Sequence, residues 1–220
     1  MKKELELTIP TDWSGVNLKK YLALRADMET YKDDDDAVTA AILMHLCGLE
    51  PMYLQSLPID AYNEIKDTIA QFINNVELPL QKFITIDGVE YGFEPNLSKM
   101  AYGAYADITK HKTLEINSDW ASIMNILYRP IVHRKGDNYE IAKYIGDTDS
   151  DKFLNVGMDV HFGTLFFLLN LLMDLLNSTL NSTKGLANHP NIKSILERNG
   201  QLIQQSLNLL KGTSLKSMQS

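Results

Sequence analysis

Residues 160–176 constrain the fold of this chain more than any other segment. They read VHFGTLFFLLNLLMDLL, so a helix formed here would carry apolar side chains on nearly every side. Such a helix needs packing partners all round, which predicts a buried central helix. A bilayer span takes about 20 apolar residues. The run is shorter and is interrupted by Asn170 and Asp174, so no membrane span is expected.

Two hairpins are predicted to pack against this helix. Asp87 and Gly88 separate two alternating apolar runs within residues 83–93, the pattern typical of a primed two-residue turn. A second pair of runs meets at the turn sequence KGDN, which predicts a hairpin near residues 131–142. A short strand is also expected at residues 5–9.

Helical spacing and capping residues predict the remaining elements. The chain is expected to form a mainly α, α+β fold: one helical domain over residues 1–187 with a small antiparallel sheet of hairpins. Residues 188–220 are expected to form a C-terminal amphipathic helix and tail. The other expected helices run from a cap at Asp12 or Ser14 to Met28, and over residues 37–47, 58–73, 98–110 and 117–130, the last stopped by Pro130.

The net charge of −7 is distributed unevenly. Residues 1–100 carry 9 basic and 17 acidic side chains, a balance of −8, whereas residues 101–220 carry 12 and 11, a balance of +1. Phosphate contact needs clustered Lys and Arg, so no nucleic-acid partner is expected. Cys47 is the only cysteine and lies among apolar residues, which predicts a buried, unreactive thiol. No apolar segment follows the N-terminal Met-Lys-Lys, so folding in a reducing cytoplasm is expected.

Candidate chemistry is sparse. Residues 33–36 are four consecutive aspartates, interpreted either as a cation site or as an acidic helix N-terminus. The second interpretation is favoured because adjacent side chains point in different directions. His161 is interpreted as a core histidine rather than a ligand, since no second histidine lies within four residues. There is no nucleophile elbow, P-loop or paired metal-ligand motif, so we expect no cofactor and no metal. Spacing alone leaves Ser-His-Asp catalysis open, because such triads assemble from distant segments.

An aromatic-rich band admits two interpretations. It either packs a hairpin against two helices or stacks on a ligand, and packing is favoured because large aromatics dominate core energetics. The band comprises Tyr91, Phe93, Tyr102, Tyr105, Trp120 and Tyr128.

The same region resembles a family of tailed-phage proteins. The order of motifs is YGF at residues 91–93, PNLSKM at 95–100, GAYAD at 103–107 and ILYRP at 126–130. It is similar to proteins grouped with the T-even-type baseplate hub assembly chaperones, and closer to tail assembly chaperones and virion proteins of crAss-like phages. The sequence IPTDW at residues 9–13 and the Phe/Leu-rich helix at 162–176 also resemble that family. The resemblance covers about residues 5–182, and its motifs are packing motifs.

The resemblance implies a non-enzymatic phage protein that acts through protein–protein contacts. Expected partners are other tail or portal-region proteins, with homo-oligomerisation as a further expectation. The expected location is the host cytoplasm during assembly and then the virion, as tail component or ejected cargo. The alternative is an intracellular small-molecule-binding or enzymatic domain that uses the aromatic band. The candidate interface residues are Phe162, Phe166, Leu169, Ile195 and Leu207.

Overall fold

A computed structural model describes residues 8–182, apart from 74–77, 112–113 and 147–148. This part contains seven α-helices and a four-stranded antiparallel sheet, which confirms the mainly α, α+β class. The described residues divide into two compact units, one over residues 8–73 and one over residues 78–182. Each unit is described by itself, and the single domain over residues 1–187 stays a prediction. Most of the strand expected at 5–9 and all of 188–220 lie outside the described residues.

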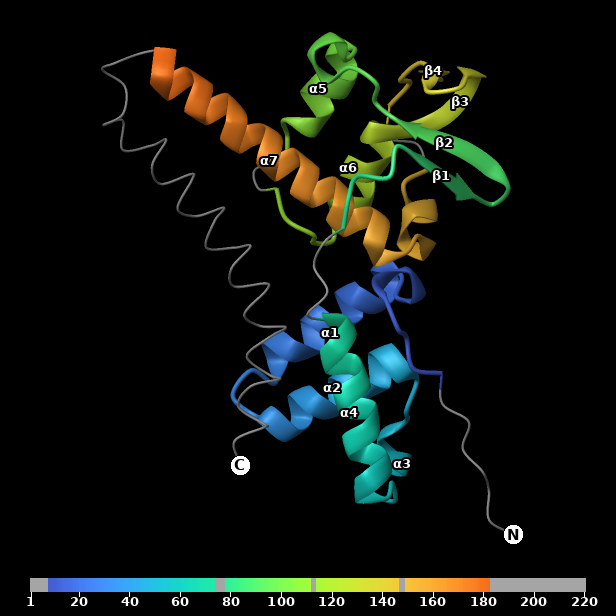
Figure 1. Cartoon of the computed structure of the whole chain (residues 1–220), viewed down its shortest axis with the longest axis vertical. Coiled ribbons are helices and arrows are strands. Elements are labelled where there is room, and N and C mark those ends of the chain that lie inside the picture. Colours follow the sequence, from blue (N-terminus) through green and yellow to red (C-terminus); the bar gives the residue numbers. More distant parts are fainter. Residues whose placement is uncertain (1–7, 74–77, 112–113, 147–148, 183–220) are drawn as a thin grey trace. The chain divides into compact units, whose positions relative to one another are not determined.

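The first unit is helical. Its core is formed where α1 and α2 pack together, with Leu18, Leu24, Leu43 and Leu46 almost fully buried. The Trp13 ring lies edge-on to Tyr21 in the same core, with their centroids 6.3 Å apart. The elements are the 3-10 turn η1 (Trp13–Gly15), α1 (Leu18–Thr30), α2 (Asp35–Cys47), α3 (Pro51–Leu54) and α4 (Ile59–Ile73) (Figure 1).

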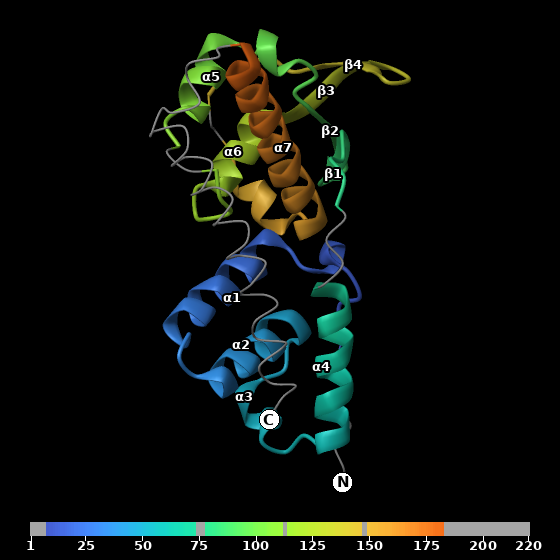
Figure 2. The same ribbon diagram turned by 60° about the vertical axis from the view of Figure 1, so that its left-hand side comes forward.

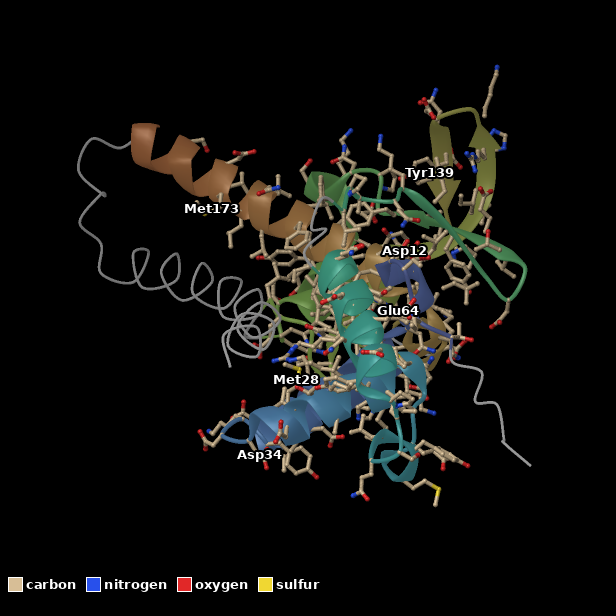
Figure 3. The ribbon with its side chains drawn as sticks, turned by 60° about the horizontal axis from the view of Figure 1, so that its bottom comes forward. Asp12, Met28, Asp34, Glu64, Tyr139 and Met173 are labelled. Carbon is tan, nitrogen blue, oxygen red and sulfur yellow. The ribbon has the colours of Figure 1, made fainter. Side chains whose placement is uncertain are left out.

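Capping side chains account for the helix starts in this unit. The start of the first helix was predicted wrongly: Asn17 caps α1 by accepting from Lys20 N at 2.9 Å. Asp12 instead accepts from Ser14 N in η1, because the chain makes a 3-10 turn before α1. Asp34, labelled in Figure 3, caps α2 by accepting from Ala37 N at 3.0 Å. The aspartate run therefore lies at a helix N-terminus, as predicted.

The second unit is built on a sheet of strand order β1-β2-β3-β4, with every neighbouring pair antiparallel. Asp87 and Gly88 have φ of 50° and 78°, the left-handed pair that a primed hairpin turn needs. Both predicted hairpins are present. The strands are β1 (Phe83–Ile86), β2 (Val89–Phe93), β3 (Tyr128–Lys135) and β4 (Asn138–Ile141).

Two of the helices predicted for this unit are shorter than expected. Residues 97–99 form the 3-10 turn η2 (Leu97–Lys99), and α5 (Tyr102–Ile108) begins only after it. The helix α6 (Trp120–Leu127) passes directly into β3, so Pro130 lies in a strand and does not stop the helix. Pro130 lies near the start of β3, next to the register shift at residues 131–133, and proline is found in sheets at strand starts and bulges. Its carbonyl accepts from Ala142 N at 2.8 Å.

The apolar segment is α7 (Met158–Ser182), which follows the 3-10 turn η3 (Asp151–Asn155). Its first half is central to the second unit (Figures 1 and 2). Toward α6, His161 accepts from the Trp120 indole N–H at 3.2 Å. Toward the sheet, Phe167 lies edge-on to Phe93, with ring centroids 5.4 Å apart. The predicted central helix is therefore confirmed for this half.

Candidate functional site

A groove of about 1000 Å³ lies between α7 and the β3–β4 hairpin in the second unit. We call it the α7–hairpin groove. Residues of the segment before β1, the loop at 94–98 and the hairpin complete its walls around three α7 side chains, Phe167, Leu171 and Leu175. Its size is that of a pocket that takes a small ligand or a few side chains of a partner.

The α7 wall is an apolar stripe. Phe167, Leu171 and Leu175 are spaced four residues apart, so they lie on one side of the helix. The stripe passes from the core outward: Phe167 packs on Phe93, whereas Leu175 is 56% exposed. Met173, labelled on α7 in Figure 3, is 46% exposed but lies on the other side of the helix and does not line the groove. At its outer end the groove therefore presents an accessible apolar side chain, that of Leu175.

The hairpin wall is held in place by Tyr139 (Figure 3). Its hydroxyl donates to Phe93 O at 2.6 Å, and its ring lies edge-on to Phe83 at 4.8 Å. Burial raises the pKa of this phenol. The ring fits because residue 92 is glycine: a Cβ at Gly92 would lie 2.7 Å from the Tyr139 ring. Tyr139 therefore holds the β3–β4 hairpin against β1 and β2. Polar hairpin side chains such as Lys135 and Glu140 line the groove.

A buried ion pair supports the loop that borders the groove. The Glu94 carboxylate accepts from the Arg129 guanidinium, and both residues are less than a tenth exposed. Glu94 also accepts from Asn96 N at 3.3 Å, which shapes the turn after β2. Among the described residues, Arg129 Nε has no hydrogen-bond partner. Removing either partner would leave the other charge buried and unpaired, so this pair fixes the loop geometry.

The start of α7 is tied to the segment that leads into β1. The Gln81 side-chain amide donates to Asp159 in the first turn of α7 at 2.5 Å. The Gln81 backbone carbonyl accepts from the hydroxyl of Tyr128 in β3 at 2.6 Å. Gly163 allows the same segment to cross the helix closely, since a Cβ there would lie 2.5 Å from Pro79 O. This crossing positions the groove stripe one turn further along α7.

His161 is a core histidine, as predicted. Its Nδ1 accepts from the Trp120 indole, and its Nε2–H donates to Phe153 O at 3.1 Å. Burial lowers the pKa of this imidazole to about 4, so it is neutral at physiological pH. In the part of the chain that the structure describes, no cluster of three or more His, Cys, Asp or Glu side chains could hold a metal ion. Cys47 is buried, as predicted, and burial raises the pKa of its thiol to about 11.

The aromatic band is divided by the fold. Tyr91, Phe93, Trp120 and Tyr128 are at most 8% exposed and pack the sheet against the helices, as the favoured interpretation predicted. Tyr102 and Tyr105 on α5 are 83% and 58% exposed. The six rings therefore do not form one accessible surface on which a ligand could stack.

Three of the five predicted interface residues lie on α7, on a different side from the groove stripe. Phe162 and Leu169 are 7% and 5% exposed, and half-buried Phe166 stacks on Phe162 with centroids 6.1 Å apart. The other two, Ile195 and Leu207, lie outside the described residues, and the role of all five stays a prediction. The groove stripe was not predicted because apolar residues on the other sides of the helix obscure its four-residue spacing.

The helix α7 is longer than the apolar run of residues 160–176, so its length alone does not exclude a membrane span. The helix α7 has 25 residues, and its window Met158–Leu175, with a mean hydropathy of 1.4, is long and apolar enough to cross a membrane by length and composition alone. It is longer than expected because the helix continues through the polar residues after Leu176. The hydrogen-bonded His161 and Thr164 favour a core role for its first half.

Comparison with protein-family models, with curated proteins and with solved structures finds no match for this chain. The resemblance to phage assembly proteins therefore stays a prediction, carried by the motifs of residues 91–130.

Proposed function

We propose that this protein is a non-enzymatic component of bacteriophage tail or portal-region assembly. It acts by binding a segment of another phage protein in the α7–hairpin groove. The observation that carries the proposal is the exposure of Leu175 in a groove whose opposite wall is polar. Accessible apolar surface rimmed by polar side chains is typical of protein–protein contact sites.

The proposal places the protein in the host cytoplasm during assembly and afterwards in the virion, as tail component or as cargo. The phage context comes from the resemblance described above. The binding mode comes from the groove, which offers an apolar stripe for anchoring side chains and a charged hairpin for orientation.

Mass spectrometry of purified particles tests the assignment first. A virion component or cargo protein is present in particles, whereas a chaperone is absent from them but needed to form tails. If gene disruption leaves tails and genome delivery normal, and the protein is absent from particles, an intracellular binding or enzymatic role replaces this proposal.

A matched pair of variants then tests the groove. Leu175→Asp places a charge on the stripe, whereas Asn170→Asp places the same charge on an exposed polar position of α7. We expect Leu175→Asp to reduce the yield of infectious particles and Asn170→Asp to leave it unchanged. Equal yields from the two variants would remove the groove from the proposal.

A further inference from the structure

The strand β1 forms an open edge of the sheet in the described part of the second unit. The strand order is β1-β2-β3-β4, so β1 ends the sheet on one side (Figure 1). Its residues, Phe83–Ile86, include neither a charged side chain nor a proline, which are the residues that usually keep an edge strand from pairing further. The β4 edge differs, because Glu140 lies in it and a register shift lies beside it. Of these two edges, β1 is therefore better suited to take a further strand.

The register of the β1–β2 hairpin decides which backbone groups of β1 face outward. Phe93 N donates to Lys82 O at 2.9 Å, and hydrogen-bonded pairs alternate with non-bonded pairs along an antiparallel ladder. The backbone groups of the two isoleucines in β1 therefore bond to β2, whereas those of Phe83 and Thr85 point away from it. Among the described residues, no backbone group bonds to these outward groups. The edge thus presents two N–H and two C=O groups in the geometry of a strand ladder.

Side chains of the other strands hold this edge in place. The Arg134 guanidinium lies over the Phe83 ring, with its central carbon 3.7 Å from the ring centroid, and Tyr139 lies edge-on to the same ring. Arg134 also forms an ion pair with Glu90 on β2. Because these contacts keep β1 extended without a further strand, little ordering of the edge is needed when another strand pairs with it.

The pattern of β1 is complementary to itself when a second copy runs antiparallel. With Ile84 of each copy beside the two-fold axis, Phe83 of one copy lies opposite Thr85 of the other. Each such pair can exchange two hydrogen bonds through its outward groups. The two buried Ile84 side chains then lie next to each other in a close, non-hydrogen-bonded pair and continue the apolar side of the sheet.

The charges at the two ends of β1 favour the same arrangement. Lys82 precedes the strand, Asp87 follows it, and both are exposed. In an antiparallel pair, the end that carries Lys82 in one copy meets the end that carries Asp87 in the other, and symmetry repeats this contact. A parallel copy would bring like charges together, which charge complementarity disfavours.

We infer that two copies of this chain pair through β1, antiparallel about Ile84, so that the four strands of each copy join in one sheet. The interface is short, so the pair forms and dissociates with protein concentration. The inference goes beyond the proposed function, and it stands independently of it because no residue of Phe83–Ile86 lines the α7–hairpin groove.

Hydrogen exchange of single amides, followed by NMR on the purified full chain, tests the inference without any phage partner. It is measured at two protein concentrations that differ by about a hundredfold. We expect the Thr85 amide to exchange at least about tenfold more slowly at the higher concentration, because the second copy then accepts its hydrogen bond. The Ile84 and Ile86 amides are the internal control, since they bond to β2 and should be equally protected at both concentrations.

A matched pair of variants identifies the edge as the interface. Thr85→Pro removes an outward N–H and no hydrogen bond to β2, a position at which an edge strand accepts proline. Thr85→Val keeps the N–H and the preference for a strand. In sedimentation equilibrium at the higher concentration, we expect the parent chain and Thr85→Val to approach twice the mass of one chain, and Thr85→Pro to keep the mass of one chain.

A second pair of variants tests the charges and leaves the strand itself unchanged. Lys82→Glu places a carboxylate near Asp87 of the other copy, whereas Lys143→Glu makes the same change at an exposed position outside β1. We expect Lys82→Glu to raise the concentration needed for pairing at least about fivefold, because like charges then meet, and Lys143→Glu to leave it unchanged. An unchanged circular dichroism spectrum above 250 nm shows that each variant is folded.

Three results would overturn the inference. The Thr85 amide could exchange equally fast at both concentrations, which would mean that no second copy pairs with the edge. It could be equally protected at both, which would mean that a segment of the same chain covers the edge. Finally, Lys82→Glu or a folded Thr85→Pro could pair as the parent chain does, which would place the interface elsewhere. None of the three bears on partner binding in the groove, which the Leu175→Asp and Asn170→Asp pair tests separately.

Discussion

The two halves of α7 have similar sequences and different surroundings. Between Met158 and Leu169 the helix is buried or half-buried, and its polar groups are hydrogen-bonded: His161 to Trp120, and Thr164 to Val160 O at 2.8 Å. Beyond Leu169 the side chains of Met173 and Leu175 are accessible. Apolar composition therefore identified the helix, but burial depends on where the sheet and α6 end.

Insertion of a charge should distinguish the halves most strongly. We expect Leu169→Asp to lower the free energy of unfolding by about 3–5 kcal/mol, because Leu169 is 5% exposed and the new carboxylate would lack a partner. Leu175→Asp should cost less than about 1 kcal/mol, since surface changes are usually small. Urea denaturation measures both, and similar costs would show that the second half is as buried as the first.

Acid should weaken the first half through His161. Burial holds its folded-state pKa at about 4, below the ordinary 6.5, so between these values the unfolded chain binds a proton that the folded chain does not. Its contribution to the free energy of unfolding is complete above pH 6.5 and falls by about 3 kcal/mol as the pH approaches 4. The free energy of unfolding is measured as a function of pH for the parent protein and for His161→Asn, and the difference between the two curves isolates this loss. The same pH dependence in both proteins would contradict the prediction.

The close approach of Pro79 to Gly163 offers a third test of how tightly the first half of α7 is packed. Gly163→Ala places a Cβ 2.5 Å from Pro79 O, so the crossing segment must shift, at a cost of about 1–3 kcal/mol. Gly103→Ala is the control in α5, where the nearest atom to the new Cβ is 3.5 Å away and alanine favours the helix. Thermal unfolding should show a loss of stability only for Gly163→Ala.

The smallest expected difference concerns two hydroxyls that bond to the helix backbone. Thr164 is buried and also contacts the Tyr128 hydroxyl at 3.2 Å, so Thr164→Val should cost about 1 kcal/mol. Ser178 donates to Leu175 O at an exposed position, and Ser178→Ala should change stability by less than about 0.5 kcal/mol. Chemical denaturation of both variants compares them directly.

Local signals predicted local structure well. The Asp87-Gly88 turn, the second hairpin and the end of the predicted helix at residue 47 were confirmed, and Gly48, with φ of 68°, caps that end. The errors lie where two signals competed, as at Pro130, where proline is compatible with a strand as well as with the end of a helix.

The candidate site was harder to predict because it is a product of packing. Phe167, Leu171 and Leu175 are apolar like their neighbours, and only the position of the β3–β4 hairpin makes them a wall. The buried pair of Glu94 and Arg129 was missed for a similar reason, since the partners are 35 residues apart and no local pattern links them. Contacts between distant segments determine both features.

The missing Cβ at Gly92 has a consequence for how this sequence can change over generations. Because the Tyr139 ring fills the space over Gly92, a larger residue at 92 becomes acceptable only after residue 139 has become smaller. The order of the two substitutions matters, since the reverse order passes through a clash. We therefore expect positions 92 and 139 to vary together among descendants of this gene, with glycine retained wherever the large ring is kept.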